Sequence, residues 1–124
     1  MGTEPGRALD KLVEEFLKSL EAPLSTYGYR LSMEARNLLI LKFGEGVQRM
    51  RTLGEPTSTQ VETARASVDS LGAEITRQAE LVQEERRRAS GQSILVRVIE
   101  PAMVTSALKR LCPPEGPGIW PFCG

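Results

Sequence analysis

Apolar side chains recur at three- and four-residue steps along most of this chain, and this spacing gathers them on one face of an α-helix. Residues 8–20 carry the first such stripe, and Pro23 is expected to end that helix. Residues 33–53 carry a second stripe behind Ser32, which is a favourable N-cap residue. Because residues 38–43 are apolar on most sides, we expect them to be buried in a core or against a partner. The sequence therefore predicts an all-α fold.

A break is expected at Pro56, and a third helix should follow it. Thr57 with Gln60 fits the spacing of a capping box, so this helix is expected to start there and to end near Ser90. Its stripe is narrow and is typical of a coiled-coil seam. The stripe consists of Val61, Ala64, Val68, Leu71, Ile75 and Val82. Two arrangements fit the sequence: a central helix that is split in two at Pro56, or one in which residues 54–72 form an insertion or a coiled-coil arm.

The last third of the chain changes character twice. Residues 93–99 are mostly β-branched and apolar, which predicts a short extended piece. Pro101 then opens a final helix that should end at Leu111, because proline is well tolerated in a first helical turn. Residues 112–124 are too rich in proline and glycine for regular structure. We expect one helical domain over residues 1–111, followed by an irregular tail.

The chain contains no histidine, and this excludes the Ser-His-Asp and Cys-His forms of nucleophilic catalysis. Two cysteines without histidine cannot complete a structural zinc site within one chain. The 124 residues carry 16 basic and 16 acidic side chains, so any contact with nucleic acid must come from a local basic patch. We therefore expect a non-enzymatic protein with no metal and no cofactor.

The N-terminal residues lack the apolar run of a secretory signal, and residues 38–41, the longest apolar run, are too short to cross a bilayer. The expected location is intracellular, nuclear or cytoplasmic, in a reducing compartment. Cys112 and Cys123 are expected to be free thiols there, although the Pro/Gly-rich segment between them would sterically allow a disulfide.

Two local patterns resemble the histone-fold family. Residues 30–35 (Arg-Leu-Ser-Met-Glu-Ala) are similar to the start of the family's central helix, and residues 98–108 are similar to its second loop and third helix. The resemblance implies a short helix, a long central helix that is split or extended here, and a short third helix. This chain departs from the family at Met103, where an acid is usual, and over residues 33–89, which exceed the family's central helix in length.

The resemblance also implies where the arginines would lie. In a histone-like pair, the second loop of one chain lies beside the first loop of its partner, so basic residues from both loops would form one patch. Such a patch would bind the phosphates of duplex DNA. The DNA-binding residues implied are Arg30, Arg86, Arg87, Arg88 and Arg97. The alternative is a solvated helix end, since cations near a helix C-terminus are favourable and Glu84 can pair with Arg88.

The apolar stripes exceed what two short flanking helices can cover, so we expect the chain to self-associate unless a partner is present. The residues expected at this partner interface are Leu38, Leu39, Leu41, Phe43, Val47, Val68, Leu71, Ile75, Val82, Trp120 and Phe122. For the two aromatic residues of the tail, folding back onto the core is an equally good interpretation.

These observations give two functional hypotheses. The first is a histone-fold-like subunit that pairs with another helical chain in a chromatin, centromere or transcription assembly, with duplex DNA as a secondary partner. The second is a helical scaffold or adaptor in an assembly unrelated to DNA, which uses residues 57–89 as a coiled-coil arm. Neither involves a membrane or a small-molecule substrate.

Overall fold

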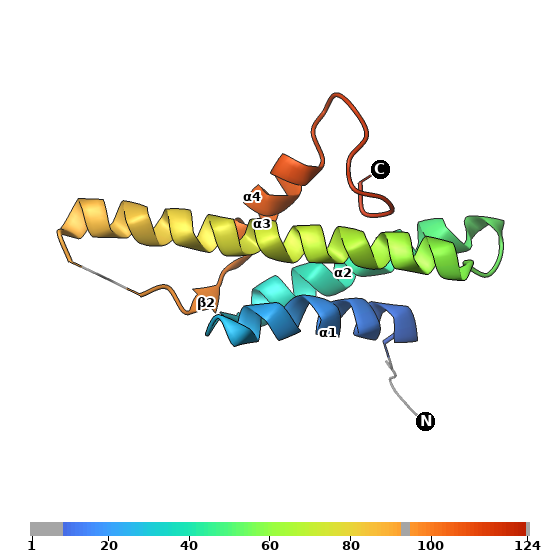
Figure 1. The fold of residues 1–124 in the computed structure, drawn as a ribbon, viewed down its shortest axis with the longest axis horizontal. Coiled ribbons are helices and arrows are strands. Elements are labelled where there is room, and N and C mark those ends of the chain that lie inside the picture. Colours follow the sequence, from blue (N-terminus) through green and yellow to red (C-terminus); the bar gives the residue numbers. More distant parts are fainter. Residues whose placement is uncertain (1–8, 93–94, 124) are drawn as a thin grey trace.

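The computed structural model describes residues 9–92 and 95–123, and these fold into four α-helices and two very short strands (Figure 1). The helices are α1 (Lys11–Thr26), α2 (Met33–Met50), α3 (Ser58–Ser90) and α4 (Pro101–Leu111). A 3-10 turn, η1 (Arg51–Leu53), follows α2, and the strands are β1 (Arg30–Leu31) and β2 (Val98–Ile99). The prediction of an all-α fold is confirmed.

Two long helices and two short ones enclose a single core. The short helices α1 and α4 each pack against both α2 and α3, and in Figure 1 they lie on opposite sides of α3. Buried apolar side chains from all four helices form one cluster, with Phe16 of α1, Leu39 of α2, Leu71 of α3 and Val104 of α4 inaccessible to solvent. Each helix therefore buries its apolar face against elements of the same chain.

The loops before α2 and α4 are joined by a parallel strand pair. Arg30 is opposite Val98 and Leu31 is opposite Ile99. The N–H of Arg30 donates to the carbonyl of Arg97 at 2.9 Å, and the N–H of Ser32 donates to the carbonyl of Ile99 at 3.0 Å. This pair fixes the start of α2 beside the start of α4.

The central segment is split in two, as one of the two interpretations predicted. The turn η1 and Gly54, whose φ is 111°, separate α2 from α3. Thr57 forms the predicted capping box, because its side chain accepts from the N–H of Gln60 at 3.1 Å while the Gln60 side chain accepts from the N–H of Thr57 at 2.9 Å. The interpretation of residues 54–72 as a coiled-coil arm is wrong, since Ala64, Val68 and Leu71 in this part of α3 are buried in the core.

The helix ends follow the capping residues closely. Ser32 caps α2 by accepting from the N–H of Ala35 at 3.0 Å, and Pro101 stands in the first turn of α4, both as predicted. The expected end of the first helix at Pro23 is wrong, because α1 continues to Thr26. A proline lacks the N–H that would donate to the preceding turn, but its carbonyl can still accept, and the N–H of Tyr27 donates to the carbonyl of Pro23 at 3.3 Å.

At the other helix boundaries the agreement is close. The first helix begins at Lys11 behind Asp10, whose carboxylate accepts from the N–H of Leu12 at 2.9 Å, while Ala8 lies outside the described residues. The third helix ends at Ser90, and Gly91 takes up a left-handed conformation with φ of 72°. Of the extended piece expected over residues 93–99, the described part forms a strand only at β2.

The tail has no regular structure, as predicted, but it is part of the folded core. Phe122 is buried, and its ring centroid lies 5.8 Å from that of Phe16 and 5.2 Å from that of Phe43. Gly46 makes room for this ring, because a Cβ atom there would lie 2.5 Å from it. Two hydrogen bonds hold the tail backbone: Arg49 donates to the carbonyl of Pro121 at 2.7 Å, and Ser67 donates to that of Trp120 at 2.6 Å.

The expectation of two free thiols is wrong, because Cys112 and Cys123 form a disulfide with their Cα atoms 5.4 Å apart. The tail turns back on itself, and the N–H of Ile119 donates to the carbonyl of Leu111 at 3.3 Å. This return brings the end of the tail next to the end of α4, where Cys112 lies.

Candidate nucleic-acid interface

The backbones of Arg30 and Arg97 are adjacent because the two short strands pair. Arg30 is in β1, and Arg97 directly precedes β2. The backbone carbonyl of Arg97 accepts the hydrogen bond from the backbone N–H of Arg30. Both side chains are exposed. The Arg97 guanidinium lies over Gly28, since its Nη1 is 3.1 Å from the position that a Cβ atom of residue 28 would occupy. The fold thus brings together two basic residues that are far apart in the sequence.

The other three predicted arginines lie at the C-terminal end of α3. Arg86, Arg87 and Arg88 are exposed, and the last buried residue of α3 is Ala79. The helix continues for about three more turns beyond Ala79, so its end projects from the body of the protein (Figure 1). Exposure on a projecting helix end leaves these guanidinium groups accessible to a large ligand.

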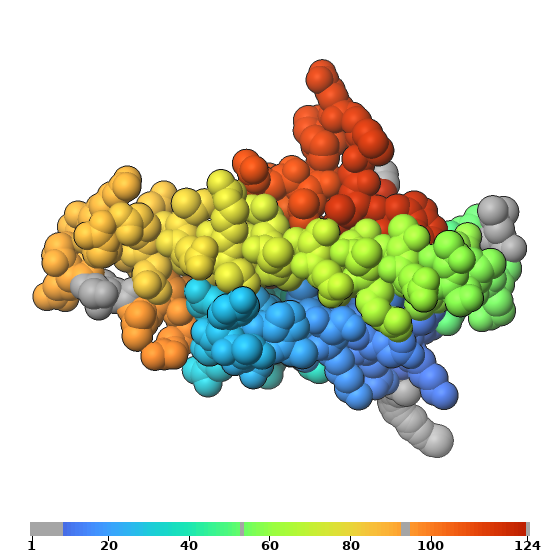
Figure 2. Space-filling view, viewed as in Figure 1, coloured from blue at the N-terminus to red at the C-terminus, as the bar shows by residue number. Residues whose placement is uncertain are grey.

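One hydrogen bond ties the two groups of arginines to the same end of the molecule. The N–H of Val96, next to Arg97, donates to the side chain of Gln83 on α3 at 2.9 Å. In Figure 2 the orange end of α3 and the segment leading into β2 lie together at one end of the protein. We refer to Arg30, Arg86, Arg87, Arg88 and Arg97 as the arginine cluster.

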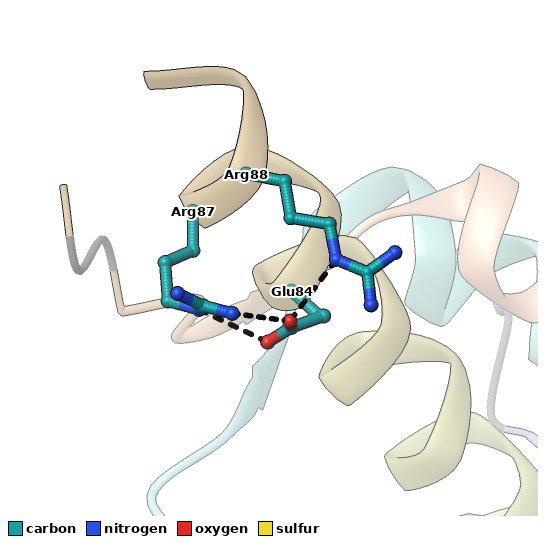
Figure 3. A network of polar contacts seen from close by, with 3 residues as sticks. All are labelled: Glu84, Arg87 and Arg88. Atoms are coloured by element: carbon teal, nitrogen blue, oxygen red, sulfur yellow. Dashed lines mark hydrogen bonds and ion pairs between the residues drawn. The ribbon is translucent and has the colours of Figure 1, made fainter. Parts of the chain in front are cut away.

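Glu84 partly neutralises the arginine cluster. Its carboxylate accepts from the Nε of Arg87 at 3.1 Å and from the Nε of Arg88 at 3.2 Å (Figure 3). These contacts lower the pKa of Glu84, chiefly through the hydrogen bonds from Arg87, and they raise the pKa of Arg87. Arg30, Arg86 and Arg97 make no ion pair with any residue that the structure describes. The cluster therefore keeps unpaired positive charge despite the balanced composition of the chain.

The predicted partner interface is wrong for most of its residues, because they are buried in the chain's own core. These residues are Leu39, Phe43, Val47, Val68, Leu71, Ile75 and Phe122. The prediction counted only two short helices as cover, whereas α3 and the tail also close over the apolar faces. The expectation of self-association loses its physical basis for the same reason.

Four residues of that predicted interface are not fully buried. Leu38 and Val82 are partly buried against the core, while the Leu41 side chain is 58% exposed and the Trp120 side chain is 38% exposed. The two exposed residues come from different elements, α2 and the tail. Of the tail aromatics, Phe122 thus folds back onto the core, and Trp120 stays accessible to solvent.

Sequence reasoning missed a groove between α2, α4 and the tail. The cavity there measures about 310 Å³, and the apolar side chains that line it include Leu38, Leu108 and Phe122. Its charged lining residues are Lys42, Glu45, Arg49 and Lys109, and Lys42 pairs with Glu45 at 3.7 Å. Only the return of the tail creates this groove, and no residue pattern in the sequence indicates that return.

Within residues 9–92 and 95–123, no helix is both long and apolar enough to cross a membrane. The same residues contain no group of three or more histidine, cysteine, aspartate or glutamate side chains that could hold a metal ion.

Comparison with protein-family models, with curated proteins and with solved structures gives no match for this chain. Any assignment of function therefore depends on the residues and their geometry.

Proposed function

We propose that this protein is a non-enzymatic, histone-fold-like subunit that binds the backbone of duplex DNA through the arginine cluster. The parallel pairing of β1 with β2 carries this proposal, because it places Arg30 next to Arg97 at the end of the molecule where α3 presents three more arginines. Several arginines at one end of the molecule suit the spaced phosphates of a duplex, and guanidinium groups bind phosphate oxygens in a bidentate manner.

The arrangement of the strands also supports the resemblance to the histone fold. In that family the first loop of one chain lies beside the second loop of its partner. Here a helix, a strand and a helix (α1, β1, α2) precede a long helix, a strand and a helix (α3, β2, α4), and the two strands pair within one chain. In this proposal the two halves of one chain take the places of two histone-like partners.

The proposed contact is electrostatic and independent of DNA sequence. Three of the arginines lie at the C-terminal end of α3, and the other two lie at the paired strands. The zero net charge of the chain gives little long-range attraction, so we expect an affinity of about micromolar or weaker at physiological salt. A chromatin, centromere or transcription assembly, and hence a nuclear location, would supply DNA at high local concentration.

The test compares two variants that lose the same charge. One carries alanine at all five positions of the arginine cluster. The matched control carries alanine at five exposed basic residues elsewhere: Lys11, Lys18, Arg36, Arg77 and Lys109. Fluorescence anisotropy with labelled duplexes of two unrelated sequences measures the binding. The proposal predicts a large loss of affinity for the cluster variant on both duplexes and a small loss for the control. Equal losses for the two variants would contradict it.

A second candidate function, an adaptor that binds another helical protein, is favoured by the groove between α2, α4 and the tail. Its lining combines apolar side chains with three basic residues and one acidic residue, which suits an amphipathic helix with an acidic face. Leu41, on the same helix as Leu38, supplies further exposed apolar surface. Affinity capture with wild type and with a Leu41→Glu/Leu108→Glu variant tests this function. A helical partner that is captured by wild type and lost by the variant, while DNA binding is unchanged, would support it.

A further inference from the structure

We propose that Ser90 is a phosphorylation site for a protein kinase that selects arginine upstream of serine, and that its phosphate weakens the hold of the arginine cluster on DNA. The first half stands on the sequence and geometry around Ser90. The second half rests on the proposed function.

The sequence around Ser90 has the charge pattern that such a kinase reads. Arg87 and Arg88 stand three and two residues before Ser90, with the small Ala89 between Arg88 and the serine. Kinases choose substrates by complementary charge, and an acidic substrate groove favours guanidinium groups at these two positions. No other serine or threonine in the chain has arginine at both positions.

The structure distinguishes Ser90 from the nearest competitors. Ser67 has one upstream arginine, Arg65, but it is buried and its hydroxyl donates to the carbonyl of Trp120. Thr52 is exposed but lacks an arginine two residues before it. Ser90 is exposed, and its hydroxyl donates to the carbonyl of Arg86 at 2.8 Å, which is a contact that rotation of the side chain can break.

The end of α3 can open locally to enter a kinase groove. A kinase binds its substrate in an extended form, so the last helical turn must unwind first. That turn contains no buried residue, since α3 buries nothing after Ala79, and Gly91 already turns the chain away with φ of 72°. A helix end of this kind frays at low cost because no tertiary packing is lost.

The chemical step needs only MgATP as co-reactant. The Oγ of Ser90 attacks the γ-phosphorus of ATP, the bond from that phosphorus to the bridging oxygen of ADP breaks, and the hydroxyl proton passes to the kinase's catalytic aspartate. The products are ADP and phosphoserine, whose phosphate carries a charge of about −1.5 to −2 at neutral pH.

The phosphate would be placed where it competes with DNA. Arg86 stands four residues before Ser90, so the two side chains lie on the same face of α3. Arg87 and Arg88 already form ion pairs with Glu84, and a phosphate group nearby would neutralise the positive charge that remains on these two arginines. We expect duplex affinity to fall by about tenfold at moderate salt, because roughly one or two phosphate contacts are lost.

The experiment has two stages that fail separately. In the first, the full chain is incubated with MgATP and a kinase that phosphorylates an Arg-Arg-Ala-Ser control peptide, and mass spectrometry locates the phosphate. We expect stoichiometric phosphate on Ser90 of the wild-type chain and no phosphate at residue 90 of the Ser90→Ala variant. The kcat/KM of phosphorylation should fall tenfold or more for Arg87→Ala and for Arg88→Ala. The reaction should be faster for Ala89→Gly, because glycine loosens the last helical turn. If the kinase phosphorylates the control peptide but leaves Ser90 unmodified, the proposed phosphorylation site is wrong, whatever the DNA-binding result.

The second stage measures duplex affinity of the phosphorylated and unmodified proteins, with kinase-treated Ser90→Ala as the control. Weaker binding by the phosphorylated protein alone supports the regulatory half. Equal binding by both forms, in a protein whose five-arginine variant binds less well, overturns that half and leaves the proposed function intact. If the unmodified protein does not bind DNA at low salt, the proposed function and the regulation fail together, while the phosphorylation site stands.

Discussion

The backbone N–H of Arg30 donates to the carbonyl of Arg97 across a parallel strand pair, with 2.9 Å between the two atoms. This contact links the loop before α2 to the loop before α4, and it makes backbone neighbours of two arginines that are far apart in the sequence. Because backbone hydrogen bonds fix the two loops, the backbone positions of these two arginines are set before any ligand binds. Their long, exposed side chains keep their rotational freedom, so ordering them is part of the entropic cost of binding.

Glu84 competes with DNA for Arg87 and Arg88, so we expect its removal to strengthen binding. Glu84→Gln removes one negative charge and releases both guanidinium groups, whereas Glu85→Gln removes the same charge but makes none of these contacts. We predict that Glu84→Gln increases duplex affinity by about threefold more than Glu85→Gln, in keeping with the modest energies of exposed ion pairs. Anisotropy titrations of both variants measure this. Identical affinities would show that Arg87 and Arg88 do not contact the duplex.

Phe122 should contribute as much to stability as a residue in the centre of a helix. Its ring contacts the rings of Phe16 and Phe43 and packs against Gly46. We expect Phe122→Ala to lower the free energy of unfolding by about 3–5 kcal/mol, whereas Leu41→Ala, at a 58% exposed position, should change it little. Urea denaturation followed by circular dichroism measures both. A small effect of Phe122→Ala would mean that the tail does not complete the core in solution.

The disulfide should stabilise the fold by holding the tail in place. Cys112 and Cys123 are 11 residues apart in sequence, and closing a loop of this size is expected to contribute about 3 kcal/mol through the entropy of the unfolded chain. Oxidised wild type should therefore unfold at a higher urea concentration than either reduced wild type or Cys112→Ser/Cys123→Ser. The reduced protein and the double variant should agree with each other. Equal midpoints for all three samples would contradict this prediction.

The loss of folding stability at low pH should report on the ion pair between Asp10 and Arg51. The hydrogen bond from Arg51 is the main cause that lowers the pKa of Asp10 below its ordinary value of 3.8. A carboxyl group with a lowered pKa stabilises the fold above its ordinary pKa, and this contribution is lost as the pH falls through the lowered value.

We therefore compare wild type with Asp10→Asn, which keeps an N-cap oxygen for the N–H of Leu12 but removes the charge. Wild type should be the more stable protein at neutral pH, and the difference should begin to shrink as the pH approaches 3.8 and be lost as the pH falls through the lowered pKa of Asp10. Thermal melts at a series of pH values measure the two curves. A difference that does not change with pH would indicate that the ion pair contributes nothing.

Much of the fold could be predicted because its determinants are local. Ser32, Thr57 and Pro101 mark helix starts through their own capping chemistry, and the apolar spacing of each helix is contained within a few turns. Pro23 does not mark the end of the first helix, because a proline lacks a donor but its carbonyl still accepts from the next turn, here from the N–H of Tyr27.

The packing of the tail could not be predicted in the same way. Phe122 is buried only because Gly46, far away in the sequence, leaves space for its ring. In the sequence, a glycine at residue 46 indicates only a weak point in a helix, whereas the structure shows that it makes room for the ring of Phe122. The assignment of Leu39 and Phe43 to a partner interface was wrong for the same reason, since the pattern shows that a face must be covered and not which segment covers it.

The arginine cluster could be predicted from the sequence only through the resemblance to the histone fold. The residues themselves show a basic run at Arg86–Arg88 and isolated arginines elsewhere. What joins them is the parallel pairing of β1 with β2, and two-residue strands leave too weak a pattern in the sequence to reveal their partner.

The salt dependence of duplex binding tests the central claim most directly. Each phosphate contact contributes about 0.9 to the slope of log affinity against log salt concentration, so up to five arginine contacts predict a slope as steep as about −4.5 for wild type. The five-arginine variant should show a slope near zero, and the matched control with five other basic residues replaced should keep the wild-type slope. An unchanged slope in the five-arginine variant, or no binding by wild type even at low salt, would contradict the account.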